Sequence, residues 1–487
     1  MIRALAVAVV LASIPAGLRW LRVAQREHYH AGSVGRFQWR WWRSSPVNNL
    51  VALVSVVGLV GSIFHVMWGF LVPLAQFGPI GLPVRGATSP LAWTPRLRRL
   101  AIVTAVVVIG VAAAGLALDE PVVVVVPLFL LPFVVDFSLW VLAPYEKWAG
   151  NRWVARAAAR LKASGAEVVA ITGSYGKTTT KNYVAHLLAG SKRVVASPAS
   201  FNNRMGLARA INESLTPGTE IFVAEMGTYG PGEIAELCEW IPPTVAAVVA
   251  IGPVHLERFG AIETIVKAKE EIFDRAAVGV ICVDDPLLAA MASRRRQIMP
   301  MVEVSAGNGI VVEGERIMDG PTGVFATNLA VALGICAALG VDLGAVLPRT
   351  ADLPTAEHRQ SQITAGGGFT IIDDTFNSNP AGARSALAAL IEAGRGGKSA
   401  VVTPGMVELG HLQEEENRKF AEEAAAQADH LIVVGRTNRG ALLHGSATGR
   451  ASVTVVDSRD EAVEWVRANL GPGDAVLYEN DLPDHYP

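Results

Sequence analysis

Two neighbouring stretches of the chain are long and apolar enough to form membrane helices. Residues 100–118 contain no charged side chain, and residues 121–144 contain only Asp136. A helix needs about 20 mainly apolar residues to cross the roughly 30 Å hydrocarbon core of a bilayer. We therefore predict two transmembrane helices here, and Asp136, near the end of its stretch, has either a functional role or contact with headgroup water.

Two further apolar stretches precede this pair. Residues 50–84 are uncharged for 35 residues, which is more than one crossing requires and just enough for two short ones. Residues 4–18 are compatible with a signal peptide, but a first membrane helix agrees better with the spans that follow. Region 1–150 is therefore predicted to be an α-helical, multi-pass transmembrane region with four or five helices. We favour a hairpin at 50–84, which gives five.

Charge is distributed unevenly between this region and the rest of the chain. Residues 1–165 hold 16 basic and 5 acidic side chains, whereas the remainder holds 26 and 39. The basic residues gather at 19–43, 85–99 and 147–162, and the positive-inside rule puts such loops in the cytoplasm. We expect a multi-pass protein of the plasma (inner) membrane with the domains after residue 145 in the cytoplasm. The expected partner is the lipid bilayer, with no nucleic acid.

From about residue 165 the pattern changes to short, β-branched apolar stretches that alternate with Ala- and Leu-rich ones. This alternation is typical of βαβ units around a parallel sheet. One set of predicted strands covers 168–172, 221–225, 245–251 and 278–283. A second set covers 369–373, 400–403, 431–435, 453–456 and 475–478. We predict two α/β domains, 151–345 and 346–487.

The three cysteines indicate neither a disulfide nor a zinc site. Cys238, Cys282 and Cys336 are odd in number, scattered, and without the spacing of metal ligands. We expect them to be buried thiols.

The sharpest local motif follows the first predicted strand and opens a helix. It reads Thr172-Gly173-Ser174-Tyr175-Gly176-Lys177-Thr178-Thr179-Thr180. Glycines let backbone N–H groups approach phosphate oxygens, Lys177 reaches the β- and γ-phosphates, and Thr178 can bind Mg²⁺. The residue five before Gly176 is Ile171, so the loop is shorter than the general Walker form. The motif predicts a site for ATP and Mg²⁺.

This shorter loop resembles that of the Mur ligase family, and later motifs strengthen the resemblance over about residues 166–480. They follow one another in the family's order. The motifs are Phe201-Asn202-Asn203-Arg204-Met205-Gly206, Ala224-Glu225-Met226-Gly227, Pro231-Gly232-Glu233-Ile234-Ala235, Ile251-Gly252-Pro253-Val254-His255-Leu256-Glu257-Arg258-Phe259-Gly260, Ala268-Lys269-Glu270-Glu271-Ile272-Phe273 and Asp373-Asp374-Thr375-Phe376-Asn377-Ser378-Asn379-Pro380. They are most similar to the branch that adds D-alanyl-D-alanine to a muramyl tripeptide.

The resemblance implies a central P-loop ATPase domain, a Rossmann-like C-terminal domain and an ATP-dependent acid–amino-acid ligase that releases ADP. In such a ligase a substrate carboxylate takes the γ-phosphoryl group to form an acyl phosphate, which an amine then attacks. Because two anions must meet, positive charge has to be concentrated at the site. The implied ATP-binding residues of the loop are Gly173, Ser174, Tyr175, Gly176, Lys177, Thr178 and Thr179.

The resemblance also implies metal ligands and catalytic residues. Thr178, Glu225 and His255 match groups that hold Mg²⁺, to which oxygen and imidazole donors are suited. Lys269 matches a lysine that CO₂ converts into a carbamate, an anion able to bind a second Mg²⁺. Read alone, it would be an ordinary solvated helix lysine. Lys177, His255 and Lys269 are the expected catalytic residues.

Three further residues are implied to contact the nucleotide. Asn328 matches an adenine-side asparagine, Arg359 an arginine that meets ATP from the C-terminal domain, and Asp374 a ribose-binding acid. Arg359 and Asp374 would act only when the domains close, so closure would gate catalysis. The sequence has Val324-Phe325 where a His-Asn pair is usual, and this departure concerns the adenine contacts.

Two larger departures concern the substrate. The family's UDP-binding N-terminal domain has no counterpart, because the predicted membrane region stands in its place. Near the C-terminus, Glu479-Asn480-Asp481-Leu482-Pro483 replaces the usual Lys-Gly-Ser. We therefore expect an envelope-linked carboxylate, lipid-linked or polymeric, an amino acid or dipeptide amine, and partner enzymes of envelope synthesis such as those of peptidoglycan.

Three alternatives stay open at this point. A poly-γ-glutamate-type synthase also pairs a Mur-like ATPase with membrane helices. A catalytically degenerate, nucleotide-binding membrane scaffold would explain the altered adenine and C-terminal motifs. A transporter powered by the P-loop is disfavoured, because no second strand ends in the aspartate that such ATPases use.

Overall fold

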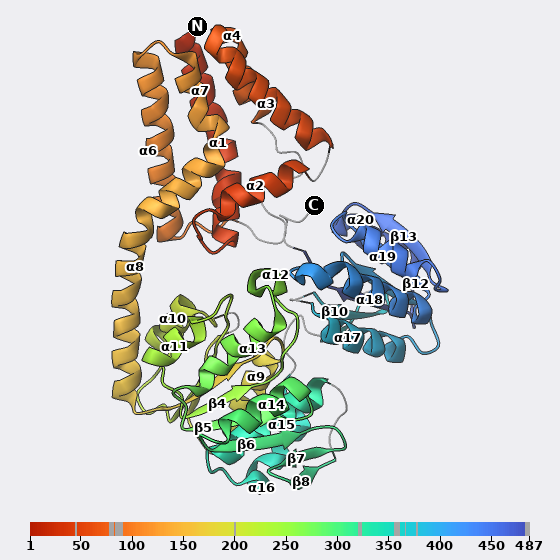
Figure 1. The fold of residues 1–487 in the computed structure, drawn as a ribbon. Helices are drawn as coiled ribbons and strands as arrows, with labels where there is room; N and C mark the ends of the chain where they lie inside the picture. Colours follow the sequence, from red (N-terminus) through yellow and green to blue (C-terminus); the bar gives the residue numbers. More distant parts are fainter. Residues whose placement is uncertain are drawn as a thin grey trace. The chain divides into compact units, whose positions relative to one another are not determined.

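The computed structural model describes residues 1–43, 46–76, 82, 91–198, 201–319, 324–354, 361–365, 367–375 and 378–482. The chain divides into two compact units, Met1–Ala149 and Gly150–Asp481 (Figure 1). The first unit is helical, and the second contains two β-sheets with their covering helices.

The first unit is built from seven complete helices and the beginning of an eighth among the residues described. They are α1 (Ile2–Arg26), α2 (Ser33–Arg43), α3 (Pro46–Phe64), α4 (Val66–Gly69), α5 (Leu71–Ala75), α6 (Pro95–Ala117), α7 (Pro121–Phe129) and α8 (Leu131–Ser164). By length and composition, α1, α3 and α6 can cross a membrane, and α7 with α8 makes a fourth candidate bent by 72°.

The predicted apolar stretches form helices, but one of them is interrupted. The stretch 121–144 is not one helix, because it breaks between α7 and α8. Pro132 lacks the N–H that would continue the hydrogen-bond ladder, so the new helix begins around it. The stretch 50–84 does turn back, since Gly61 packs under Trp68 and Gly58 against Leu71.

The described part of the returning arm is short. It consists of α4 and α5, which are packed against α3. Ten helical residues, Val66–Ala75, extend only about 15 Å, half of a hydrocarbon core. The described part of the chain contains three candidate spans, or four with the bent pair, which agrees with the predicted four-helix alternative better than with the favoured five. The number of crossings stays a prediction.

Asp136 has a structural partner inside this unit. Its side chain is only 9% exposed, and its carboxylate accepts backbone N–H groups of Gly32 at 2.9 Å, Val34 at 3.2 Å and Gly35 at 2.8 Å. These groups begin α2, where N–H groups lack helical partners. Asp136 thus caps α2, and contact with headgroup water is not needed to explain it.

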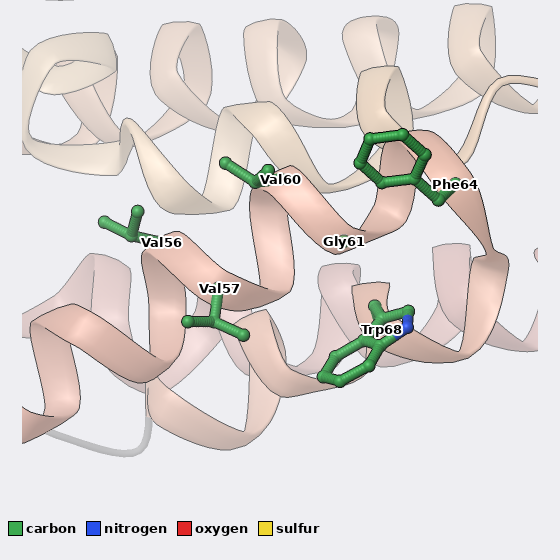
Figure 2. Close-up of a pocket in the computed structure, with 6 residues that line it drawn as sticks. All are labelled: Val56, Val57, Val60, Gly61, Phe64 and Trp68. Atoms are coloured by element: carbon green, nitrogen blue, oxygen red, sulfur yellow. The ribbon is translucent and has the colours of Figure 1, made fainter.

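An apolar hollow of about 440 Å³ lies on α3 and α4, and Figure 2 shows the side chains that line it. Its lining residues are Val56, Val57, Val60, Gly61, Phe64 and Trp68. None of them carries an ionisable group, so the hollow is no candidate for phosphoryl chemistry.

The first sheet of the second unit has eight strands in the order β2-β3-β1-β4-β5-β6-β7-β8. The pairs from β2 to β6 are parallel, and β6-β7 and β7-β8 are antiparallel. The strands are β1 (Glu167–Thr172), β2 (Val194–Ala196), β3 (Ile221–Glu225), β4 (Val245–Val248), β5 (Val278–Cys282), β6 (Met301–Ser305), β7 (Ile310–Val312) and β8 (Glu315–Met318). The four predicted strands are confirmed, and the short strands β2 and β6 to β8 were not predicted.

Helices cover both faces of this sheet (Figure 1). They are α9 (Lys177–Leu188), α10 (Arg204–Ser214), α11 (Glu233–Trp240), α12 (Leu256–Phe259), α13 (Ile262–Glu270), α14 (Pro286–Arg295), α15 (Val324–Ala338) and α16 (Leu343–Val346). Alternate strand residues face opposite layers, as a pleated strand requires. Val169 packs toward α9 and α15, and Val168 toward α10 and the final turns of α8.

The second sheet has six strands in the order β13-β12-β11-β14-β10-β9, all parallel except the edge pair β9-β10. Its strands are β9 (Ser361–Thr364), β10 (Thr370–Asp374), β11 (Ser399–Thr403), β12 (His430–Val434), β13 (Ser452–Val456) and β14 (Ala475–Glu479). Its helices are α17 (Pro380–Ala393), α18 (Gln413–Gln427), α19 (Arg439–Ser446) and α20 (Arg459–Asn469). All five predicted strands are confirmed. The predicted domain limits, 151–345 and 346–487, stay predictions.

The three cysteines are free and buried, as expected. Burial raises the pKa of each thiol to about 12, so they are inert core side chains.

Candidate active site

The glycine-rich loop lies at the carboxyl end of β1, where the strand order of the first sheet reverses. Ligands of open α/β sheets bind at such a point. The loop is fixed to the segment after β4: the Ser174 N–H donates to the Ala250 carbonyl over 2.8 Å. The Tyr175 hydroxyl donates to the Ile251 carbonyl over 3.1 Å, and the Ser174 hydroxyl to that of Gly252 over 3.0 Å. The loop is therefore a preformed cradle.

The last loop residue, Gly176, cannot carry a side chain. Its φ is +80°, in the left-handed region, and a Cβ there would overlap the amide of Asn328. The next residue, Lys177, begins α9, and its Nζ donates to the carbonyl of Gly173 over 2.8 Å and of Ser174 over 3.4 Å. The ammonium is thus held across the loop at the helix N-terminus.

Glu225 is the centre of the site. It is the last residue of β3 and only 3% exposed. Its Oε2 accepts the Thr178 hydroxyl over 2.9 Å and lies 3.3 Å from the Lys181 ammonium. Its Oε1 accepts the Asn202 amide over 3.1 Å. Its own N–H donates to the Ser197 hydroxyl over 3.2 Å, so both ends of the residue are fixed.

Charge keeps this carboxylate ionised in spite of its burial. Burial alone raises the pKa of Glu225, but the charges of Lys177 and Lys181 and the bonds from Asn202 and Thr178 outweigh it. The net pKa therefore lies below the usual value. An ionised oxygen ligand beside a threonine hydroxyl is what a hard cation such as Mg²⁺ binds.

Lys269 is a buried lysine on α13. Its side chain is 5% exposed, and among the described residues it has no hydrogen-bond or ion-pair partner. Burial, with a smaller contribution from the charge of Lys177, lowers the pKa of its amine well below the usual value. The effect of Lys177 also places Lys269 within electrostatic range of the nucleotide loop. A lowered pKa increases the share of neutral, nucleophilic amine, unlike in the solvated lysine that the sequence alone would suggest.

His255 begins α12, with φ +59°. Its Nδ1 is hydrogen-bonded to the carboxylate of Glu408, which follows β11 in the second sheet. Its ring also meets the ring of Tyr229 edge to face, with centroids 4.9 Å apart.

The remaining nucleotide candidates are partly described. Asn328, on α15, is 2% exposed and lies against Gly176 and the Thr180 hydroxyl, which is 3.4 Å away. It therefore supports the loop directly. Asp374, 7% exposed, ends β10 in the second sheet. Arg359 lies outside the described residues.

The oxygen donors at this site suit Mg²⁺, which phosphates and water also bind, better than a metal that is bound by protein side chains alone. In the described ranges, no three His, Cys, Asp or Glu side chains converge on one point. Mg²⁺ is usually bound by one or two protein oxygens, with phosphates and water completing its shell. Thr178 and Glu225 supply two adjacent oxygens.

Sequence reasoning missed three members of this region. Lys181 lies one helical turn after Lys177, so the i, i+4 spacing could have found it. Asn202 stood within a recognised motif but had no assigned role. Glu408 is far from His255 in sequence, and only the tertiary structure pairs them.

Comparison with known proteins agrees with this geometry. The Mur ligase middle domain model matches residues 171–325, and the Mur ligase, glutamate ligase domain model matches 358–478. The UDP-N-acetylmuramoyl-tripeptide–D-alanyl-D-alanine ligase of Mycobacterium tuberculosis is 34% identical, over 66% of this chain and 71% of that protein.

Two solved structures share the fold. MurF from Acinetobacter baumannii superposes with a TM-score of 0.60 at 23% identity, over 68% of this chain and 77% of that one. MurF from Thermotoga maritima in complex with ADP gives 0.57 at 25% identity, over 68% and 80%.

The chain belongs to the Mur ligase family. It is accordingly an ATP-dependent ligase that forms C–N bonds. Within that family, it is similar to the enzymes that add D-alanyl-D-alanine.

Proposed function

We propose that the chain is a membrane-anchored ligase of peptidoglycan or related envelope synthesis. It joins an envelope-linked carboxylate to the amine of an amino acid or dipeptide. The observation that carries the proposal is the group formed by Lys177, Thr178 and the buried, ionised Glu225 at the carboxyl ends of β1 and β3. This group concentrates charge where a phosphoryl group is transferred.

In the first step, a carboxylate oxygen of the substrate attacks the γ-phosphorus of ATP, the bond to the β-phosphate oxygen breaks, and ADP leaves. Lys177 faces the phosphates and offsets their charge. Thr178 and Glu225 would hold Mg²⁺, which when bound supplies charge neutralisation and orientation of the phosphates. In the second step the amine attacks the acyl carbon, phosphate leaves, and the amine loses a proton.

We assign Lys269 a carbamate role. Its low pKa supports it, because only a neutral amine can attack CO₂. The neutral amine nitrogen forms a bond to the carbon of CO₂ and releases one proton, so a buried neutral amine becomes an anion. That anion would be a further oxygen ligand for Mg²⁺ beside His255. A buried carbamate anion is costly without a partner of opposite charge, and Mg²⁺ would be that partner.

Asp374 and Arg359 are the proposed contacts from the C-terminal domain, to the ribose and to the phosphates. Asp374 ends a strand at the carboxyl edge of its sheet, where ligands of parallel sheets bind. Closure of the two domains would bring these groups to the nucleotide and exclude water.

Three helices of sufficient length and apolarity support anchoring in the membrane. The basic loops support an orientation with the ligase in the cytoplasm. The relatives are named for a UDP-N-acetylmuramoyl tripeptide and D-alanyl-D-alanine. D-Alanyl-D-alanine is therefore the first amine to test, against acceptors that are soluble, lipid-linked or polymeric.

The decisive experiment measures ADP release by the full chain in detergent or nanodiscs, with and without each amine. We expect release that depends on both an envelope acceptor and an amine. Nucleotide binding without amine-dependent release would contradict the proposal and favour a scaffold. Deleting the gene and finding which envelope component loses an amide-linked amino acid would then identify the acceptor.

Anchoring is tested separately with reporters fused to the C-terminus. We expect a reporter that works in the cytoplasm to be active and one that works in the periplasm to be silent. The opposite result would reject the orientation while leaving the ligase assignment intact.

A further inference from the structure

We propose that Glu408 is a positioning residue that orients the imidazole of His255 toward the bound metal. A residue of the second sheet would thereby complete a metal site carried by the first. The inference rests on the proposed function, because that is where His255 is assigned to the metal.

The hydrogen bond fixes which nitrogen of His255 is free. A carboxylate can only accept, so the Nδ1 of His255 must carry the hydrogen that it donates to Glu408. In the neutral imidazole this leaves the Nε2 lone pair for a metal. Metal-binding histidines generally donate their other N–H to a carboxylate or carbonyl, which sets the tautomer and the ring direction.

Two neighbours restrict the rotation of this pair. A guanidinium nitrogen of Arg258 lies 3.7 Å from the second oxygen of Glu408. The same guanidinium lies 4.9 Å from the centre of the Tyr229 ring, which packs against His255. The imidazole is therefore held by the aromatic ring of Tyr229 and by the carboxylate of Glu408.

Backbone atoms near Glu408 also contact the segment that follows His255. The Glu257 N–H donates to the Glu408 carbonyl over 3.4 Å. A Cβ on Gly410 would come within 3.1 Å of Glu257 nitrogen, so the two backbones approach closely. Leu412 packs on the apolar cluster that includes Leu256 and Ala268, the neighbour of Lys269. The segment 408–412 thus covers both helices that carry candidate metal ligands.

Backbone conformation is a second, independent observation. His255 has φ +59° and Glu408 has φ +64°, and both are non-glycine residues in the left-handed region. That conformation is sparsely populated and persists where the surroundings enforce it, often at functional sites. Side chains that are each about a quarter exposed would gain little from an ordinary surface ion pair. Stability alone therefore gives a poor reason for two strained residues to meet here.

The test measures binding of Mn²⁺, as a spectroscopic substitute for Mg²⁺, by electron paramagnetic resonance. It uses the full chain with a non-hydrolysable ATP analogue and needs no turnover. The variants are Glu408→Ala, Glu408→Gln, His255→Ala and the double variant with both alanines. Glu422→Ala is the matched control, because Glu422 is a glutamate of α18 that pairs only with Arg418 among the described residues.

We expect Glu408→Ala to weaken Mn²⁺ binding about tenfold or more, the usual effect of losing such a partner. Glu408→Gln, which keeps an accepting oxygen, should lose less, and Glu422→Ala should bind as the wild type does. The double variant should bind no more weakly than His255→Ala, because Glu408 acts through that ring. If Glu408→Ala does not fold, as judged by circular dichroism, the same comparison is made with Glu408→Gln.

Three results would overturn the inference. They are Mn²⁺ binding by the folded Glu408 variants within twofold of the wild type, losses that multiply in the double variant, and no Mn²⁺ binding by the wild type. Failure of the proposed function is distinct from these, because it appears as absent amine-dependent ADP release while the Mn²⁺ measurements still decide the role of Glu408.

Discussion

Two buried glutamates occupy equivalent places in the two sheets and have opposite electrostatics. Glu225 ends β3 and Glu479 ends β14, and their exposed fractions are 3% and 0%. Cationic side chains surround the first, so its pKa is lowered in spite of burial. The second accepts hydrogen bonds from the hydroxyls of Ser378 and Thr403, and burial raises its pKa.

The difference shows that position at a strand end does not decide function by itself. Both glutamates end parallel strands, but the first lies among positively charged lysines that keep it ionised, and the second is hydrogen-bonded to hydroxyl groups. At the second strand end, burial keeps the Glu479 carboxyl protonated to a higher pH than that of a free glutamate. The following four tests challenge this contrast, in order of decreasing effect.

Lys177→Ala should have the largest effect. It removes the ammonium that faces the phosphates, and we expect kcat to fall roughly 10³-fold or more. ADP release measures it, and circular dichroism checks the fold. Lys192→Ala is the control, because that lysine is exposed and pairs with Glu220 at the surface. Activity retained by Lys177→Ala would reject the assignment of the nucleotide loop.

Lys269→Ala tests the carbamate that we propose near Glu225. We expect kcat to fall roughly 10²-fold, the scale of losing one electrostatic contact at the reacting centre. Added formate or acetate should restore part of the activity by taking the place of the carbamate. Lys267→Ala, on the same helix but exposed, should change little. A loss that no short carboxylate relieves would argue against the carbamate.

Lys181→Met should act on stability. It leaves Glu225 buried without its close ammonium, and breaking such a pair costs about 3–5 kcal/mol. Thermal or urea unfolding of the full chain in detergent measures the change. Combining it with Glu225→Gln should restore part of the stability, since no uncompensated charge is then buried. An unchanged unfolding midpoint would mean that the pair contributes little.

Glu479→Gln should have the smallest effect of the four tests. It should change the melting temperature little at low pH and more as pH rises. The unfolded carboxyl ionises near 4.5, whereas the folded one stays neutral to higher pH. The wild type must therefore take up a proton to fold, and it loses stability as pH rises from about 4.5 through the raised folded pKa. The glutamine variant has no such loss. We expect its melting temperature relative to the wild type to increase across this window, and a pH-independent difference would contradict a neutral Glu479.

Much of the fold was predictable because it depends on local composition. The apolar, β-branched residues of β1 and β5 indicate buried parallel strands, and both are found. Strands β2, β7 and β8 contain only three or four residues, too few to show a period. The bend between α7 and α8 depends on a proline within an otherwise continuous apolar stretch. The hydropathy of the stretch does not indicate this bend.

The site was predictable only where its residues share a motif. Lys177 and Thr178 lie beside each other in sequence, and their loop follows a strand. Glu225 was known from its motif, but its ion pair with Lys181 depends on how β3 and α9 pack. The contact of Glu408 with His255 joins two sheets, so nothing local specifies it.

The cap that Asp136 provides for α2 has a consequence for biosynthesis. The carboxylate and the N–H groups that it accepts are 101 to 104 residues apart in the chain. At about 5–20 residues per second, a ribosome needs roughly 5–20 s to make the intervening segment. During that interval the start of α2 must rely on water or another protein for its hydrogen bonds. A chain that stops before α8 therefore displays an unfinished helix end, a mark by which quality-control proteases can distinguish incomplete copies from finished ones.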